Sequence, residues 1–299
     1  MNCELSNVVT KDGVNLQGLL FTPTLSTDTV GILIHGLGSN FYGGYTRLTT
    51  LARYFMRNKL ALATFNTRGH DVVTFATKQD KRKQKGYRGI RVGAAFEKFT
   101  DSVLDLEAIV EVLGKRYSNV VLIGHSTGAN KVVYYLSRRN VQKKIAGAIL
   151  ISPVSDVPMV QERLGGDLEE ALNVARKMVK SGKSSELVKQ ILPQSIYSAQ
   201  RLVSLGDQRS IEQMFPTKEF QGPLRLVKKI KIPILVLFGD KDDYLRVDGV
   251  SVNVLLDAFR SNTESRSFST HVMPQADHSF SGKEEELAQN LVEWIKKNN

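Results

Sequence analysis

The 299-residue sequence contains one cysteine, Cys3, and no long uninterrupted hydrophobic run. A single cysteine cannot form an internal disulfide or a cysteine-based zinc site, which excludes a disulfide-stabilised scaffold. No segment reaches the roughly 18 consecutive apolar residues of a membrane-spanning helix. The first residues also lack the basic start and the apolar stretch of a secretory signal. We therefore expect a cytoplasmic protein without a membrane span.

What the chain does contain is typical of a globular protein with a large core. Hydrophobic residues make up 41% of the sequence and charged residues 24%. The length fits either two domains or one α/β domain with an insertion, because α/β domains are often larger than average. We expect one domain with an insertion.

Short apolar runs alternate with segments of helical periodicity along most of the chain. Residues 5–22 predict an initial β-hairpin, because apolar residues alternate with polar ones around an Asp-Gly turn. The further expected strands are residues 29–36, 60–70, 119–124, 145–152, 232–240 and 267–274. Apolar strands separated by helices predict a mostly parallel sheet with helices on both faces, an α/β fold. Residues 154–228 lack such a strand and are mostly polar, so we expect a helical cap inserted into a core of residues 1–153 and 229–299.

The sequence Gly-His-Ser-Thr-Gly at residues 124–128 stands between an expected strand and an expected helix. In this context G-x-S-x-G is typical of a nucleophile elbow, a turn too tight for side chains on its flanking residues. The helix behind Ser126 would direct backbone N–H groups at a developing anion. The same pattern also occurs as a simple strand-to-helix turn. Its function therefore depends on whether the chain supplies a base and an acid.

The chain contains five histidines that could serve as that base. His125 adjoins the serine on its turn, His35 and His70 follow earlier strands, and His271 lies inside an expected strand. His278 lies on a polar loop between the last strand and the final helix. From there its ring could reach across the carboxyl edge of the sheet, so we assign it as the base.

The acid should lie beyond the end of the strand at residues 232–240, which comes between the serine and the histidine in the chain. Asp240, Asp242 and Asp243 are the candidates there. Five motifs now stand in order along the chain: HGLGSN, NTRGHD, GHSTG, FGDKDD and ADHSF. Together they resemble the α/β-hydrolase superfamily over nearly the whole chain. The resemblance implies a catalytic triad of Ser126, Asp242 and His278, in the chain order of this fold, with Asp243 as the alternative acid.

The same resemblance implies an oxyanion hole made by the backbone N–H groups of Leu37 and Thr127. The implied reaction is hydrolysis of a carboxylic ester through an acyl-enzyme on Ser126, without a cofactor or a metal. The cap over such a core is similar to those of small carboxylesterases and monoacylglycerol-lipase-like enzymes. The same residues could instead cleave amides, peptides or C–C bonds, or transfer an acyl group. A ligand-binding protein without catalysis is the non-enzymatic alternative.

The net charge of +11 is concentrated in residues 78–91, which carry seven basic residues against one acid, Asp80. We expect this segment to be a loop at the carboxyl edge of the sheet. It is interpreted either as a solvated loop or as a patch that attracts an anionic ester substrate or an acidic surface. Nucleic-acid binding is not expected, because the segment has one aromatic residue, Tyr87, and no recognised motif. The sequence does not indicate an oligomeric state.

Overall fold

The computed structural model describes residues 2–138, 141–164, 167–189, 196–218 and 224–298. Its central strands are β1 (Asn2–Val9), β2 (Asn15–Thr22), β3 (Thr29–Ile34), β4 (Ala61–Phe65), β7 (Asn119–His125), β8 (Gly147–Ile151), β9 (Ile234–Gly239) and β10 (Phe268–Met273). Within the described chain they form one eight-stranded sheet of order β1-β2-β4-β3-β7-β8-β9-β10. β2 pairs antiparallel with β1 and with β4, and all other neighbours are parallel.

The strands follow the apolar runs of the sequence. Every residue of β4, β8 and β9 is buried. A strand that is covered on both faces has no side in contact with water, so its residues are mostly apolar, and Thr64 of β4 is the one polar residue of these three strands. The initial hairpin and the six further strands expected from the sequence are all present. The prediction of a mostly parallel sheet is therefore confirmed.

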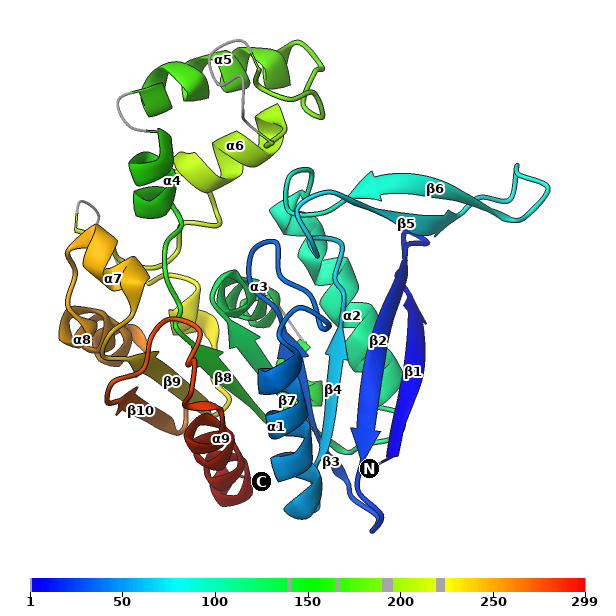
Figure 1. Ribbon diagram of the computed structural model, residues 1–299, viewed down its shortest axis with the longest axis vertical. Coiled ribbons are helices and arrows are strands. Elements are labelled where there is room, and N and C mark those ends of the chain that lie inside the picture. The colour runs from blue at the N-terminus through cyan, green and yellow to red at the C-terminus, as the bar shows by residue number, and fades with distance from the viewer. Residues whose placement is uncertain (1, 139–140, 165–166, 190–195, 219–223, 299) are drawn as a thin grey trace.

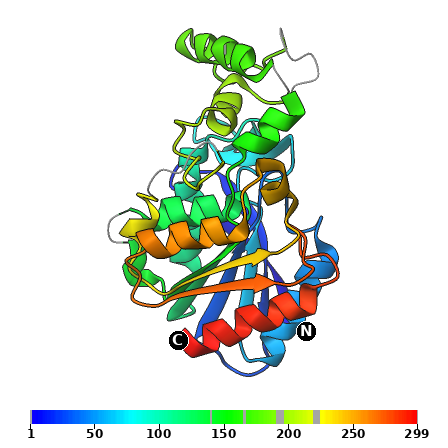
Figure 2. The same cartoon turned by 90° about the vertical axis from the view of Figure 1, so that its left-hand side faces the viewer.

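Helices cover both faces of this sheet, as Figure 2 shows. The flanking helices are α1 (Tyr45–Arg57), α2 (Ser102–Leu113), α3 (Thr127–Leu136), α8 (Val252–Asn262) and α9 (Glu284–Asn298). The short α7 (Asp243–Asp248) follows β9 at the carboxyl edge of the sheet, and single 3-10 turns lie at Phe99–Asp101, Val141–Lys144 and Val227–Lys229. In α1, Leu48, Leu51 and Phe55 are three or four residues apart and share one helix face. That face packs with α9 on one side of the sheet, while α2, α3 and α8 pack on the other. None of the described helices is both long enough and apolar enough to cross a bilayer.

Between β8 and β9 the described chain forms the three α-helices α4 (Val157–Leu164), α5 (Leu168–Lys180) and α6 (Ala199–Gly206). They lie beyond the end of the sheet in Figure 1 and surround an apolar cluster of their own, which includes Leu168 and Leu202. Farther along the chain, Phe215 and Leu224 belong instead to the main core. The segment predicted as a cap, residues 154–228, thus has its own small core over α4–α6, while its last residues pack with the sheet.

The basic segment is a β-hairpin rather than the loop expected for residues 78–91. β5 (Thr74–Gln79) and β6 (Tyr87–Val92) pair antiparallel in a separate two-stranded sheet, which extends from the body of the molecule in Figure 1. Ala76 and Ile90 pack against the main core, whereas the opposite face is exposed. The loop prediction is wrong because a strand that is buried along part of one face leaves only a weak hydrophobic pattern, which the charged residues obscure.

Candidate active site

Ser126 occupies the sharp turn between β7 and α3. Its φ of 55° and ψ of −130° lie outside the regions that residues with a side chain ordinarily adopt, so the backbone is strained at this position. Glycines on both sides leave room for the turn. A Cβ atom at Gly124 would lie 2.5 Å from the carbonyl oxygen of Gly128, and a Cβ atom at Gly128 would clash with the carbonyl oxygen of Ile34. The G-x-S-x-G spacing therefore reflects a steric requirement for glycine at both positions.

A continuous chain of hydrogen bonds joins Ser126, His278 and Asp242. The serine hydroxyl donates to Nε2 of His278 over 2.9 Å. The Nδ1–H group of His278 donates to the carboxylate of Asp242, whose two oxygens each lie 2.9 Å away. All three side chains are buried. The structure thus brings together, in hydrogen-bonding order, a hydroxyl, an imidazole and a carboxylate, which are the groups that acyl transfer by serine requires.

Asp242 is the aspartate of its loop that contacts this histidine. Its carboxylate also accepts a hydrogen bond of 3.0 Å from the backbone N–H of Tyr244, so it caps the N-terminus of α7. Asp240 and Asp243 are exposed, and Asp243 lies 3.8 Å from the guanidinium of Arg246. Across the described residues, no group of three or more His, Cys, Asp or Glu side chains is arranged to hold a metal ion.

Two further aromatic side chains hold His278 in place. The Nε2–H group of His125 donates to the backbone carbonyl of His278 over 2.8 Å. Burial, together with the charge of Arg47, lowers the pKa of His125 well below that of a free histidine, so this ring stays neutral. The ring of Tyr244 stacks on that of His278 with centroids 4.1 Å apart. Sequence reasoning gave neither residue a part in the site, and no motif marks Tyr244.

Leu37 and Thr127, the expected oxyanion donors, belong to two turns beside Ser126. Thr127 is the first residue of α3, so its N–H group has no acceptor within the helix. Leu37 follows Gly36, where a Cβ atom would lie 3.0 Å from the Cβ atom of Ser126. The backbone of the loop after β3 therefore approaches the serine closely.

His35 anchors the loop that carries Leu37. Its Nδ1–H group donates to the carbonyl of Gly36 over 2.9 Å, and its Nε2 atom accepts from the backbone N–H of Thr67 over 3.2 Å. Burial, reinforced by the charge of Lys131, lowers the pKa of His35 to about 3. The ring is therefore neutral near pH 7, as one donating and one accepting nitrogen require.

Four charged side chains that are inaccessible to solvent connect α3 to the cap. Lys131 of α3 lies 2.6 Å from Glu97, and Arg201 of α6 lies 2.6 Å from Glu212 and 3.6 Å from Glu97. Buried charges are stable only when they are paired, so these four side chains depend on one another. Sequence reasoning missed this network, because each of the four residue types is common on protein surfaces.

Asp156, on the segment after β8, is a buried carboxyl group outside the serine–histidine–aspartate chain. Burial, reinforced by the charge of Glu212, raises the pKa of Asp156 to about 7. Its Oδ2 atom has no hydrogen-bond partner in the part of the chain that the structure describes. The sequence offered no signal for this residue, since its burial depends on the cap.

Residues 55–297 match the family described as "Protein of unknown function (DUF1749)". The chain belongs to the DUF1749 family. A UPF0613 protein from Schizosaccharomyces pombe is 22% identical to this DUF1749 protein over 233 residues, which are 71% of this chain and 72% of that one. "Putative esterase/lipase 2" from Mycoplasma genitalium is 31% identical over 126 residues, which are 42% of this chain and 38% of that one.

The fold of the DUF1749 protein is also found among solved structures. A highly thermostable carboxyl esterase from Bacillus coagulans superimposes with a TM-score of 0.67 at 13% identity, covering 100% of this chain and 99% of the other. At such low identity the similarity establishes the fold. The α/β-hydrolase fold predicted from the sequence is therefore confirmed.

Proposed function

We propose that this DUF1749 protein hydrolyses carboxylic esters through an acyl-enzyme on Ser126. The hydrogen-bond chain from Ser126 through His278 to Asp242 is the observation that carries the proposal. The Mycoplasma genitalium relative is named "Putative esterase/lipase 2" and the Bacillus coagulans protein is named as a carboxyl esterase, which supports an ester as the bond that is cleaved.

In the first half of the proposed reaction, Oγ of Ser126 attacks the carbonyl carbon of the ester. Nε2 of His278 accepts the hydroxyl proton and then passes it to the leaving alcohol. Asp242 holds Nδ1–H and stabilises the imidazolium that forms. The backbone N–H groups of Leu37 and Thr127 donate to the oxyanion, and one such donor typically contributes about 100- to 1000-fold in rate.

In the second half, water attacks the acyl-enzyme while His278 accepts a proton from it. As the acyl–oxygen bond to Ser126 breaks, His278 returns that proton to Oγ, so the acid is released and the serine hydroxyl is restored. Leu37 also packs against the apolar cluster of the cap. An apolar acyl chain would find its nearest apolar partners there, and we therefore propose a small or amphiphilic acyl ester as the substrate.

The variant Ser126→Ala tests the nucleophile. We expect its kcat for p-nitrophenyl butyrate to fall by about 10⁴-fold or more, because no other group can carry the acyl chain. A fluorophosphonate probe should label the native protein and not the variant. Ser137→Ala, at the other end of α3, is the matched control and should keep both the turnover of the ester and the labelling by the probe. Turnover by a folded Ser126→Ala variant would refute the proposal.

A matched pair of substrates tests the kind of bond. The p-nitrophenyl ester and the p-nitroanilide of the same acyl group present the same acyl chain to the site and differ in the leaving group. We expect faster turnover of the ester. Faster cleavage of the anilide would identify an amidase that uses the same residues.

A further inference from the structure

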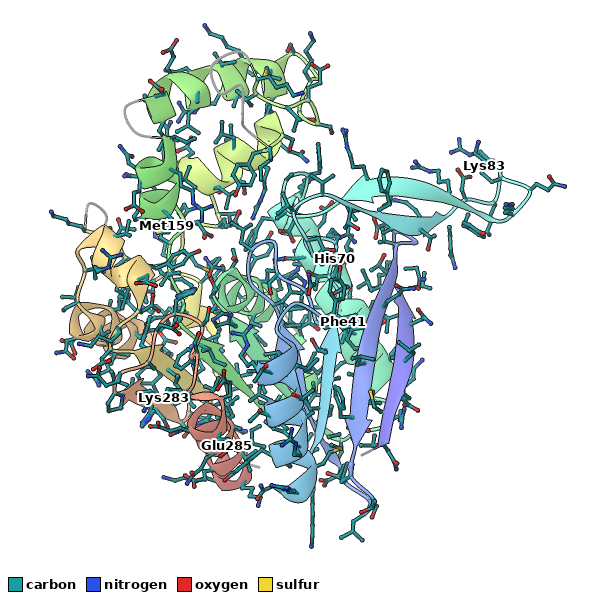
Figure 3. The ribbon with its side chains drawn as sticks, viewed as in Figure 1. Phe41, His70, Lys83, Met159, Lys283 and Glu285 are labelled. Atoms are coloured by element: carbon teal, nitrogen blue, oxygen red, sulfur yellow. The ribbon has the colours of Figure 1, made fainter. Side chains whose placement is uncertain are left out.

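The β5–β6 hairpin carries more than half of the net charge of +11. Its seven basic residues are Lys78, Lys81, Arg82, Lys83, Lys85, Arg88 and Arg91. Figure 3 shows Lys83 at the far end of the hairpin, clear of the body of the molecule. The charge therefore lies on an element that stands out from the protein.

Part of this charge is neutralised by acids of the same chain. Asp80 lies within 3.5 Å of two arginines of the hairpin, and Asp12 lies 3.3 Å from one of its lysines. The turn lysines, which are Lys81, Lys83 and Lys85, are exposed and have no ion-pair partner in the described part of the chain. Three positive charges at the tip are thus open to an external anion.

Large apolar side chains are exposed on the same hairpin, with Tyr87 next to the charged turn and Phe75 and Val73 toward its base. Phe75 is 74% exposed, Tyr87 50% and Val73 48%. In the register of the hairpin, Phe75 and Tyr87 lie on the same face, opposite the face that packs on the core. Exposed apolar side chains along one face of an element that also carries a charged turn indicate a surface that binds a partner.

We propose that the β5–β6 hairpin docks this protein on a lipid surface that contains anionic headgroups. The turn lysines meet the headgroups, and each raises the affinity roughly fivefold. Phe75, Tyr87 and Val73 enter the boundary between headgroups and acyl chains, where aromatic and aliphatic side chains are favoured. Basic and apolar side chains together on one exposed element have the chemistry that such a surface recognises.

The exposed valines favour lipid over nucleic acid as the partner. Val72 and Val73 are 45% and 48% exposed and stand just before β5. An aliphatic side chain gains free energy when it enters a lipid interface. It adds nothing to the stacking on bases by which proteins hold single-stranded nucleic acid, which needs aromatic rings.

The hairpin is fixed at its base, so a docked membrane has a defined position. The Arg91 guanidinium lies 3.9 Å from the centre of the Phe96 ring and donates to the carbonyl of Ser185 over 3.4 Å, which joins β6 to the cap segment. The hairpin follows the carboxyl end of β4, and Ser126 follows the carboxyl end of β7 in the same sheet. Docking therefore places lipid at the edge that holds the serine. An ester in that lipid would then lie near Ser126, and this consequence rests on the proposed function.

Cosedimentation of the full-length protein with lipid vesicles tests the proposal. Vesicles of phosphatidylcholine are compared with vesicles in which about a third of that lipid is replaced by phosphatidylglycerol. We expect tighter binding to the anionic vesicles, with an affinity that falls as salt is added. The variant Lys81→Gln/Lys83→Gln/Lys85→Gln should bind about 100-fold more weakly. The variant Phe75→Ser/Tyr87→Ser should weaken binding at low and at high salt, because it removes apolar contacts, which salt does not screen.

The matched control is Lys115→Gln/Lys143→Gln/Lys144→Gln. It removes the same charge from exposed positions that precede β7 and β8, at the opposite edge of the sheet, and should keep the native affinity. Equal binding to both kinds of vesicle, an equal loss in the control, or binding to a DNA duplex in place of vesicles would overturn the proposal. Binding is measured without substrate, so its outcome does not depend on whether Ser126 is a nucleophile.

Discussion

Three histidines lie close to Ser126, and their hydrogen bonds separate their roles. His35 and His125 each donate to a backbone carbonyl, and burial lowers the pKa of both, so they act as neutral supports for the loops around the serine. His278 contacts a hydroxyl with one nitrogen and a carboxylate with the other. Only this ring has the pair of contacts that proton transfer from the serine requires.

Replacing Asp242 and Asp243, two adjacent aspartates of one loop, in turn tests how the base is oriented. In Asp242→Asn, the amide can hold the imidazole in the wrong tautomer, so we expect kcat to fall by about 10⁴-fold. Asparagine caps helices as well as aspartate does, so α7 should persist. Asp243→Asn, an exposed neighbour, should leave kcat almost unchanged. Steady-state kinetics on p-nitrophenyl butyrate measures both, and the opposite ranking would make Asp243 the acid.

Asp156 predicts a dependence of stability on pH. Its pKa is raised from 3.8 to about 7 in the folded protein, mainly by burial. Between these values the unfolded chain loses the proton while the folded protein keeps it, so stability falls as pH rises. The side chain of Asp156→Asn cannot ionise, so this variant does not lose stability in this way as pH rises. Relative to the native protein, its free energy of unfolding should therefore gain on the order of 4 kcal/mol between about pH 4 and about pH 7.

Urea denaturation of both proteins across this pH range measures the difference. Because both chains unfold in the same denaturant, the comparison removes pH effects that come from other groups. Parallel curves of stability against pH would show that Asp156 ionises in the folded protein as it does in the unfolded chain.

At the scale of elements, helix α3 and cap helix α6 are joined by charge, since Lys131 and Arg201 both lie close to Glu97. Arg201→Met leaves the carboxylate of Glu212 buried without its partner, and we expect the free energy of unfolding to fall by about 3–5 kcal/mol. The double variant Arg201→Met/Glu212→Gln removes that uncompensated charge and should recover part of the loss. Urea denaturation measures both. A double variant no more stable than Arg201→Met would mean that an uncompensated charge on Glu212 is not the cause of the loss.

The elements also show where sequence patterns suffice and where they fail. β4, β8 and β9 were predictable because burial on both faces makes a strand apolar at nearly every position. β5 and β6 were not, since only a few of their residues touch the core. The buried ion pairs of Glu97 and Arg201 were hidden for a different reason. Glu97 and Arg201 lie far apart in sequence, and only tertiary packing brings them together.

At the scale of the whole molecule, the order of motifs along the chain was the strongest predictor. A serine between glycines is ambiguous by itself, but a parallel sheet brings the carboxyl ends of its strands to one edge. The motifs that end β3, β7, β9 and β10 therefore meet in space although they are far apart in sequence. The sequence could not supply the pairing of Tyr244 with His278 or the burial of Asp156, because both depend on how loops of different strands pack.

Ser126, Asp242 and His278 all stand on turns that follow strands of the sheet, and α4–α6 contribute none of them. The cap is also a single continuous stretch of chain. Mutations, insertions and deletions within it can therefore change which molecules reach the serine while the reacting groups stay in place. During evolution, proteins with this sheet can acquire new substrates through changes in the cap alone. Relatives of this protein should therefore differ most in length and sequence within the cap.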